Sequence, residues 1–278
     1  MQLFSSRGDM MNWNEIERAI QEIIADIREK CIIQNTAIKD DIFGILENNC
    51  TVIYYPMENE KNRGFHIKRI VKKKLEDFVY INTAKPIEEQ IFTAAHEFGH
   101  IFEVAEKVWK KLEYDGKPTE DEEEELTNRF AAELLMPSDA FRKLFFSHME
   151  EVGLKSGRVK LEDLVRVIVM QMTDFMVPYE AVRKRLVETK LMQPQAAVLL
   201  ITKEILQLVT ILSKDQNSYL ENRTGIKTIS GIRTLIEKAE SDANVDDYLI
   251  KKIKKDLEMA DMPEIEQVEI HIGDGGCE

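Results

Sequence analysis

The stretch IFTAAHEFGHIF, at Ile91–Phe102, contains two histidines separated by three residues, with a glutamate directly after the first. Residues four apart share one face of a helix, so His96 and His100 can direct ring nitrogens at one point about 2 Å from each, the length of a zinc–nitrogen bond. Glu97 can then act on a water molecule at that point without binding the metal itself. The chain has 5 histidines among 278 residues, so this pattern is expected by chance only about 0.01 times. It predicts a buried metal-binding helix of a hydrolase.

A third ligand is expected from the acidic run Glu120–Glu125, which precedes Asn128 and an apolar stretch. Catalytic zinc sites take three protein ligands and leave one position open. Glu124 and Asn128 are four apart and share a helical face, so Glu124 is the predicted ligand and Asn128 is predicted to hydrogen-bond a ligating histidine. The alternatives for the ligand are Glu125, Glu123 and Glu120. Most of the acidic run is expected to be a solvated surface.

Hydrophobic periodicity places this motif in a mostly helical α+β protein. The expected helices cover Asn14–Lys30, Ile38–Glu47, Glu88–Lys107, Glu120–Met136, Asp139–Glu150, Lys160–Leu191 (two helices with a turn at Val177–Pro178), Pro194–Ser213, Ile229–Ala239 and Asp246–Met259. The expected strands are Thr51–Pro56, a hairpin of Gly64–Val71 and Phe78–Asn82, and a terminal strand at Gln267–Ile272. These elements predict an α+β domain that carries the motif at 14–150, a helix-turn-helix-like extension at 151–193 and a mostly helical C-terminal region of unknown role at 194–278.

Two segments resemble the ImmA/IrrE family of zinc metallopeptidases: FTAAHEFGHIF at Phe92–Phe102 and EELTNRFAAELLMP at Glu124–Pro137. The resemblance extends more weakly over about residues 15–190, and Thr127 stands where an alanine is more usual. It implies a zincin-like fold, one Zn²⁺ held by His96, His100 and Glu124, and Glu97 as the general base of peptide hydrolysis. It further implies that the substrate is a helix-turn-helix transcriptional repressor, cleaved in a stress or mobile-element response.

Two other classes of function compete with this interpretation. One is a metal-bearing sensor or binding module that sequesters a regulator without cleaving it. The other is a DNA-binding regulator that uses the helices of Lys160–Leu191, but the net charge of −13 disfavours direct nucleic-acid binding. For the peptidase, the candidates for a second electrophile are Tyr80, Tyr114 and His148, whereas His66 and His271 are given no role.

The rest of the composition indicates a protein of the cytoplasm without a membrane span. Three widely spaced cysteines predict free thiols rather than disulfides. No secretory signal is recognised, and the most apolar window, 196–212, is interrupted by Lys203 and Glu204. The hairpin of 65–82 carries Lys68, Arg69, Lys72, Lys73 and Lys74. Its edge is either a site for pairing with an extended substrate or a charged edge that prevents aggregation.

Overall fold

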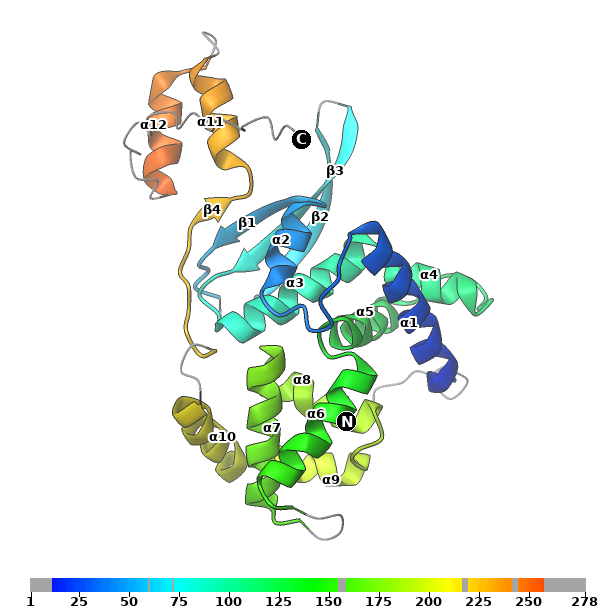
Figure 1. Ribbon diagram of the computed structural model, residues 1–278. Coiled ribbons are helices and arrows are strands. Elements are labelled where there is room, and N and C mark those ends of the chain that lie inside the picture. Colours follow the sequence, from blue (N-terminus) through cyan, green and yellow to red (C-terminus); the bar gives the residue numbers. More distant parts are fainter. Residues whose placement is uncertain are drawn as a thin grey trace, which may run out of the picture. The chain divides into compact units, whose positions relative to one another are not determined.

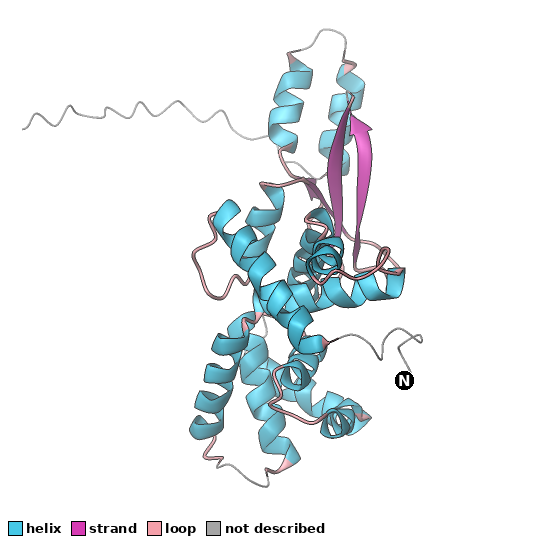
Figure 2. Ribbon diagram, turned by 90° about the vertical axis from the view of Figure 1, so that its right-hand side faces the viewer, coloured by secondary structure: helices cyan, strands magenta, loops and turns pink. Residues whose placement is uncertain are grey.

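A computed structural model describes residues 12–59, 61–71, 73–154, 159–216, 220–241 and 245–257 (Figure 1). The chain forms two compact units that divide between Ser230 and Gly231. The first unit combines many helices with a small mixed sheet, which confirms the α+β class expected from the sequence (Figure 2). The expected domain boundaries at 150 and 193 fall inside the first unit.

The first unit contains the sheet and most of the helices. Its helices are α1 (Trp13–Lys30), α2 (Asp41–Glu47), α3 (Ile87–Ile101), α4 (Val104–Lys111), α5 (Glu120–Leu135), α6 (Ser138–Glu151), α7 (Leu161–Phe175), α8 (Tyr179–Glu188), α9 (Pro194–Val198), the 3₁₀ helix η2 (Leu199–Ile201) and α10 (Lys203–Gln216). Its strands are β1 (Thr51–Tyr55), β2 (Gly64–Val71), β3 (Lys74–Asn82) and β4 (Thr228–Ile229). The second unit contains α11 (Ile232–Glu240) and α12 (Asp247–Asp256).

The sheet has the strand order β2-β3-β1-β4. The central strands β1 and β3 are parallel, whereas β2 and β4 are antiparallel edge strands. Val52, Val79 and Ile81 are fully buried on one face of the sheet, where α2 and α3 pack on it. The alternation of buried and partly exposed residues along these strands is the pattern of a sheet covered by helices on one face.

A strap of chain at 222–230 closes the β1 edge of the sheet. The backbone amide of Ile87 donates to Asn222 O at 2.9 Å, and that of Gly225 donates to Thr83 O at 3.0 Å. The amide of Ser230 donates to Val52 O at 2.8 Å, and β4 pairs with β1. Residues more than a hundred positions apart in the sequence therefore complete the same sheet.

The metal-motif helix α3 packs directly on α5. Gly99 marks the closest approach, because an added Cβ would lie 2.8 Å from Thr127 Cγ2 and 2.9 Å from Phe130 Cδ1. Both neighbours are buried side chains of α5. The absence of a side chain at Gly99 therefore sets how near the two helices lie.

We expect Gly99→Ala to destabilise the protein by about 1–3 kcal/mol, because overpacking exceeds the gain in helix propensity. Gly44→Ala is the matched control, since Gly44 also lies in a helix and its added Cβ meets nothing within 4 Å. That control should be neutral or slightly stabilising. Denaturant unfolding of both variants measures the difference. Equal stability of the two would show that the helices do not depend on this close contact.

Several expected boundaries were wrong. The single helix expected at Glu88–Lys107 is two helices, because Glu103 adopts a left-handed conformation with φ 50°. The helix expected at Pro194–Ser213 is likewise broken, where Thr202 is extended and its hydroxyl accepts from the Ile205 amide. β3 begins at Lys74 instead of Phe78, and Ile229 ends a short strand instead of starting a helix. The strand expected at Gln267–Ile272 lies outside the described residues.

No single helix among the described residues has the length and apolar composition of a membrane span. The pair Pro194–Ile201 and Lys203–Lys214 passes that test together, but it bends by 76°. Cys31 and Cys50 are free thiols, and Cys277 lies outside the described part of the chain.

Candidate metal centre

Two helices supply the side chains of the candidate site. His96, Glu97 and His100 lie on the last two turns of α3, and Glu124 lies in the second turn of α5. A capping box fixes the start of α5: the Thr119 hydroxyl accepts from the Glu122 amide at 3.3 Å, and the Glu122 carboxylate accepts from the Thr119 amide at 2.8 Å. This cap holds the acidic first turns of α5 beside the histidine face of α3.

The nitrogen and oxygen donors converge on one point. His96 Nε2 and His100 Nε2 are 3.1 Å apart. Glu124 Oε2 lies 3.4 Å from His96 Nε2, and Glu124 Oε1 lies 3.4 Å from His100 Nε2. Ligand atoms 2.0–2.1 Å from a tetrahedral zinc ion are separated by roughly 3.3–3.4 Å. The two rings and the carboxylate are therefore close enough to share one such ion, with the two 3.4 Å distances ending on different oxygens of Glu124.

The hydrogen-bond partners of the two Nδ1 atoms, which face away from the shared point, indicate whether this donor set suits a cation. His96 Nδ1 lies 3.1 Å from Asn128 Oδ1, and His100 Nδ1 lies 3.2 Å from Glu123 Oε1. Both partners are acceptors, so Nδ1 of each ring is placed to donate its hydrogen outward, which leaves Nε2 directed at the shared point. Two ring nitrogens and a carboxylate brought this close together form a donor set that zinc and similar ions bind. The residues present thus fit a divalent cation.

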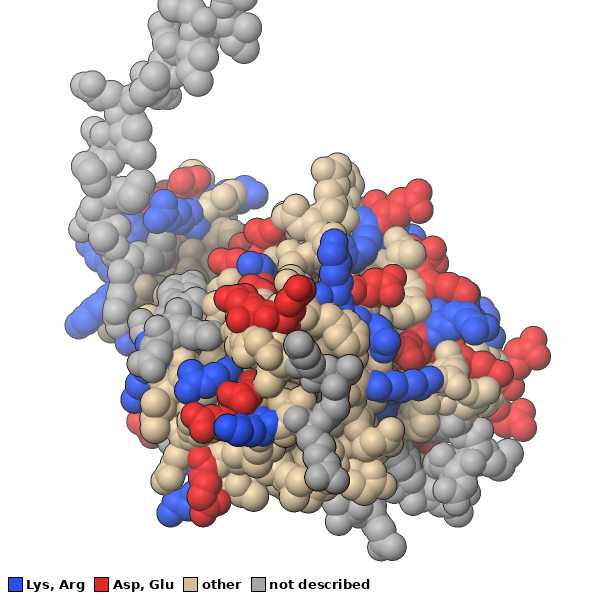
Figure 3. All heavy atoms as spheres, turned by 60° about the horizontal axis from the view of Figure 1, so that its bottom comes forward, with Lys and Arg blue, Asp and Glu red and all other residues tan. Residues whose placement is uncertain are grey.

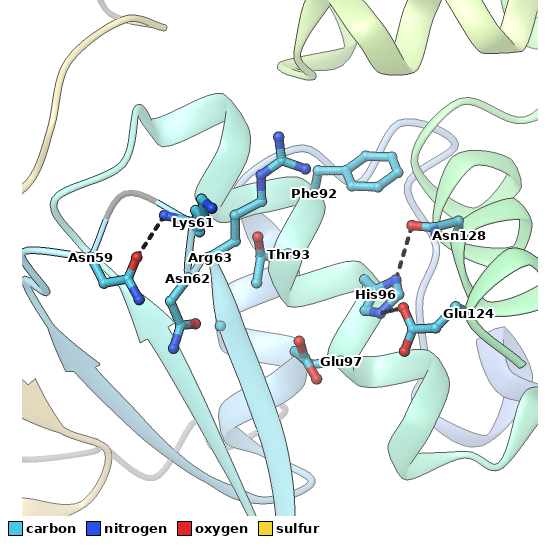
Figure 4. A pocket seen from close by; sticks show the side chains of 11 residues that line it. Asn59, Lys61, Asn62, Arg63, Phe92, Thr93, His96, Glu97, Glu124 and Asn128 are labelled. Atoms are coloured by element: carbon cyan, nitrogen blue, oxygen red, sulfur yellow. Dashed lines mark hydrogen bonds and ion pairs between the residues drawn. The ribbon is translucent and has the colours of Figure 1, made fainter. Parts of the chain in front are cut away.

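Glu97 faces a cleft beside the triad (Figure 4). Its side chain is buried, and that burial raises the pKa of its carboxyl group, although the neighbouring histidines oppose the shift. A carboxylate with a raised pKa is a better proton acceptor than an exposed one. Glu97 is not one of the three residues whose donor atoms converge, so it is free to exchange protons with a molecule in the cleft.

The carboxylate of Glu124 stabilises positive charge at the triad. Its hydrogen bonds to His100 and His96 lower the pKa of Glu124 below its usual range. Burial disfavours the charged form of His100, but Glu124, Glu97 and Glu123 outweigh it and raise the pKa of His100. The site therefore places three carboxyl groups, Glu124, Glu97 and Glu123, around the imidazoles, which is the electrostatic setting for a bound cation.

The cleft has a volume of about 520 Å³. In Figure 4 the segment with Asn59, Asn62 and Arg63 forms one wall, α5 forms the other, and α3 lies between them. The guanidinium of Arg63 binds Glu89 at 3.0 Å, which anchors this wall to α3. An added Cβ at Gly64 would lie 2.6 Å from Thr93 Cγ2 on α3, so the start of β2 lies directly against the metal-motif helix.

The structure brings together His96, His100, Glu124 and Glu97, and it places Asn128 against His96 as expected. Of the alternative ligands, Glu123 contacts the outer nitrogen of His100, and Glu125 instead binds Arg129 at 2.8 Å. Glu120 is the first residue of α5, one turn before Glu124.

The proposed second electrophiles lie elsewhere, outside the lining of the cleft. The Tyr80 hydroxyl donates to Tyr55 O at 2.7 Å. Tyr114 packs edge-on against Trp109, and His148 Nε2 binds Asp174 Oδ2 at 2.7 Å. The contact of Glu123 with His100 and the cleft wall around Arg63 were not anticipated. The sequence spacing around Glu123 does not predict its contact with His100, because this contact depends on how α5 lies across α3.

A family model described as the IrrE N-terminal-like domain, of peptidase family M78, matches residues 47–187. The chain belongs to this family. It is a family of metallopeptidases, so the triad and Glu97 lie within the part of the chain that carries the peptidase domain. No curated protein and no solved structure matches the chain significantly. Residues 188–278 lie beyond the IrrE N-terminal-like match.

Proposed function

We propose that this protein is a zinc-dependent endopeptidase, with His96, His100 and Glu124 as ligands of one Zn²⁺ and Glu97 as the general base. The observation that carries the proposal is the convergence of two Nε2 atoms and one carboxylate within 4.8 Å of one another, with each Nδ1 bound to an outward acceptor. Outer-shell acceptors of this kind fix the tautomer and orientation of metal-binding histidines. Mn²⁺ and Fe²⁺ also accept two histidines and a carboxylate, but two histidines and a glutamate with one open position are the usual ligand set of a catalytic zinc.

In this mechanism Glu97 moves the protons. When bound, zinc supplies Lewis acidity to the attacking water and to the peptide carbonyl. One carboxylate oxygen of Glu97 takes a proton as the water oxygen bonds to the carbonyl carbon. Glu97 then gives this proton to the amide nitrogen as the carbon–nitrogen bond breaks. Asn128 and Glu123 hold the two rings in place throughout.

For the substrate we propose a helix-turn-helix transcriptional repressor in the cytoplasm, cleaved in a stress or mobile-element response. Support comes from the resemblance of the two motif segments and from the cleft, which opens at the start of the edge strand β2. An edge strand offers backbone groups to an extended chain. A segment of repressor that is unfolded, or that unfolds locally, fits this opening better than a folded helix.

A regulator that binds DNA through α7 and α8 has less support. On α8, Arg183 binds Glu180 at 2.5 Å, and Arg185 is buried against Glu133. Figure 3 shows acidic and basic side chains interspersed over one face of the molecule, with uncharged surface between them. A DNA-binding helix needs free cations on one face to contact phosphates. A binding module that sequesters a regulator without cleavage remains the second candidate, because the same donor set would hold its metal.

Removal of the metal tests the proposal. We expect the chain to lose all hydrolysis of a proteome-derived peptide library after treatment with a chelator, and to regain it with about one equivalent of Zn²⁺. Mass spectrometry of new peptide termini measures the activity. Magnesium serves as the control ion, because it prefers six oxygen ligands and should not restore cleavage. Full activity of the metal-free chain would contradict the proposed mechanism.

A further inference from the structure

The tip of the β2–β3 hairpin has an unusual surface for an acidic protein. The strand register pairs Ile70 with Leu75 and Val71 with Lys74 at the end of the hairpin. Ile70 is 77% exposed and Leu75 is 64% exposed. The hairpin extends beyond α3, which covers only its base (Figure 1). Two apolar side chains thus face solvent as a pair at the end of the ribbon.

Ile70 and Leu75 lie on one face of this tip together with Lys68 and Asp77, and Arg69 and Lys74 lie on the other face together with Val71 and Glu76. Directly paired residues of an antiparallel ribbon share a face, and successive residues alternate. Ile70 and Leu75 therefore continue the face that α3 buries further along β3, whereas Arg69 and Lys74 lie on the other face. Lys73, in the turn, has a positive φ of 69°.

The cations of the tip are available to a partner. Lys68, which precedes them, binds Glu103 at 2.7 Å, but Arg69, Lys73 and Lys74 are exposed and form no ion pair with any residue that the structure describes. The whole chain carries 51 acids against 38 bases. A local group of free cations in such a chain attracts anionic groups that the rest of the surface repels.

β2 connects this tip to the candidate site. The strand begins at Gly64, which lines the cleft, and it is an edge strand with β3 as its neighbour in the sheet. Six residues separate Gly64 from Ile70, which corresponds to roughly 20 Å of extended strand. A chain that pairs with the edge of β2 from the cleft outward therefore reaches the tip about six residues from the bond being cleaved.

We infer that the hairpin tip is a second binding site for the substrate, and that it selects a segment in which an acidic residue adjoins an apolar one. This inference rests on the proposed peptidase function. In a strand added to β2, an acidic side chain would lie beside Arg69 and an apolar side chain would lie beside Ile70. Lys74 and Leu75 of β3 extend the same two surfaces one strand further from the added chain.

Other anionic partners fit the tip less well. A bilayer would meet the end of the hairpin first, where Lys73 and Lys74 are exposed, whereas the apolar pair stands behind them on one face only. Phosphates of a nucleic acid would use the cations but leave the exposed Ile70 and Leu75 without a partner. A protein strand uses the cations, the apolar pair and the strand edge together.

Direct binding tests this inference independently of catalysis. The probe is a fluorescein-labelled ten-residue peptide of alternating Glu and Val, and the full chain carries Glu97→Gln so that the probe is not cleaved. Anisotropy should show saturable binding that weakens at higher salt. A peptide of alternating Lys and Val should bind at least about tenfold more weakly, because its charges are reversed.

Two double variants separate the faces of the tip. Arg69→Glu with Lys74→Glu, and Ile70→Thr with Leu75→Thr, should each weaken probe binding by about tenfold, as expected for two exposed contacts of up to about 1 kcal/mol each. Lys143→Glu, an exposed charge reversal on α6, should bind like the parent. Unchanged melting temperatures would show that all variants are folded.

Some results would overturn the inference while leaving the peptidase intact. Equal binding of the probe by the parent and both tip variants is one. Tip-dependent binding of phosphatidylserine vesicles or of duplex DNA, without tip-dependent binding of the peptide, is another. Failure of the peptidase proposal itself would instead appear in the hydrolysis assay, as activity that does not depend on the metal. The binding measurement involves no hydrolysis, so the two failures can be distinguished.

Discussion

Glu97→Gln should reduce peptide hydrolysis by about 10²–10⁴-fold, the usual contribution of a general base, while zinc content stays at that of the wild type. The glutamine side chain has nearly the same shape but cannot accept the proton from the attacking water. Glu97 is buried beside the triad without belonging to the converging donor set, so its replacement leaves the metal ligands in place. The peptide-library assay and metal analysis on the same preparation measure both quantities.

Glu125→Gln is the matched control for this experiment. Glu125 is a carboxylate on the adjacent helix that binds Arg129, and it lies outside the converging donor set. Its loss should leave hydrolysis within about twofold of wild type, as for a partly exposed ion pair. If Glu97→Gln cleaves as fast as Glu125→Gln, the protein is not a peptidase of this mechanism. If the wild type cleaves no peptide and Glu97→Gln still binds the same partner, a binding module that sequesters a regulator becomes the better account.

His96→Ala should remove nearly all bound zinc. The wild type is expected to contain about one zinc ion per chain, and the variant less than about a tenth of that after dialysis. The substitution removes one of the three metal-binding side chains and leaves Asn128 without its ring partner. Zinc should also raise the melting temperature of the wild type and not that of the variant, because only a site that binds the folded state stabilises it.

His148→Ala controls for the loss of a buried histidine as such. His148 is 8% exposed and pairs with Asp174 of α7, away from the candidate centre. This variant should lose stability but keep its zinc. Equal zinc content in His96→Ala and the wild type would end the assignment of the metal centre, whatever the variant does to hydrolysis.

Local spacing was enough to predict that His96, His100 and Glu124 come together, because helix geometry relates sequence distance to direction. His96 and His100 are one turn apart on α3, and the four-residue spacing of Glu124 and Asn128 distinguished Glu124 from its acidic neighbours. The register that brings α5 to α3 depends on Gly99, whose role was not anticipated. The close contact of Gly99 with α5 can be recognised only in the structure, where Phe130 lies opposite this glycine.

Other features depend on contacts that local patterns do not encode. Glu103 breaks the long helix without a glycine or a proline at the break. β4 is two residues long and forms only because β1, far earlier in the chain, offers an edge. The wall of the cleft formed by Asn59 and by Lys61–Gly64 carries no recognisable motif, because its position depends on the sheet and on the Arg63–Glu89 ion pair.

The strap at 222–230 has a consequence for how the enzyme matures during synthesis. The sheet supporting the cleft gains its last strand, β4, only after residue 229 has left the ribosome, although the family match ends at residue 187. Until then β1 keeps a bare edge, which is the feature that nascent chains use to mispair with one another. Completion of the sheet therefore waits for a segment beyond the peptidase match, and a chain terminated at the boundary of that match would carry the exposed edge permanently.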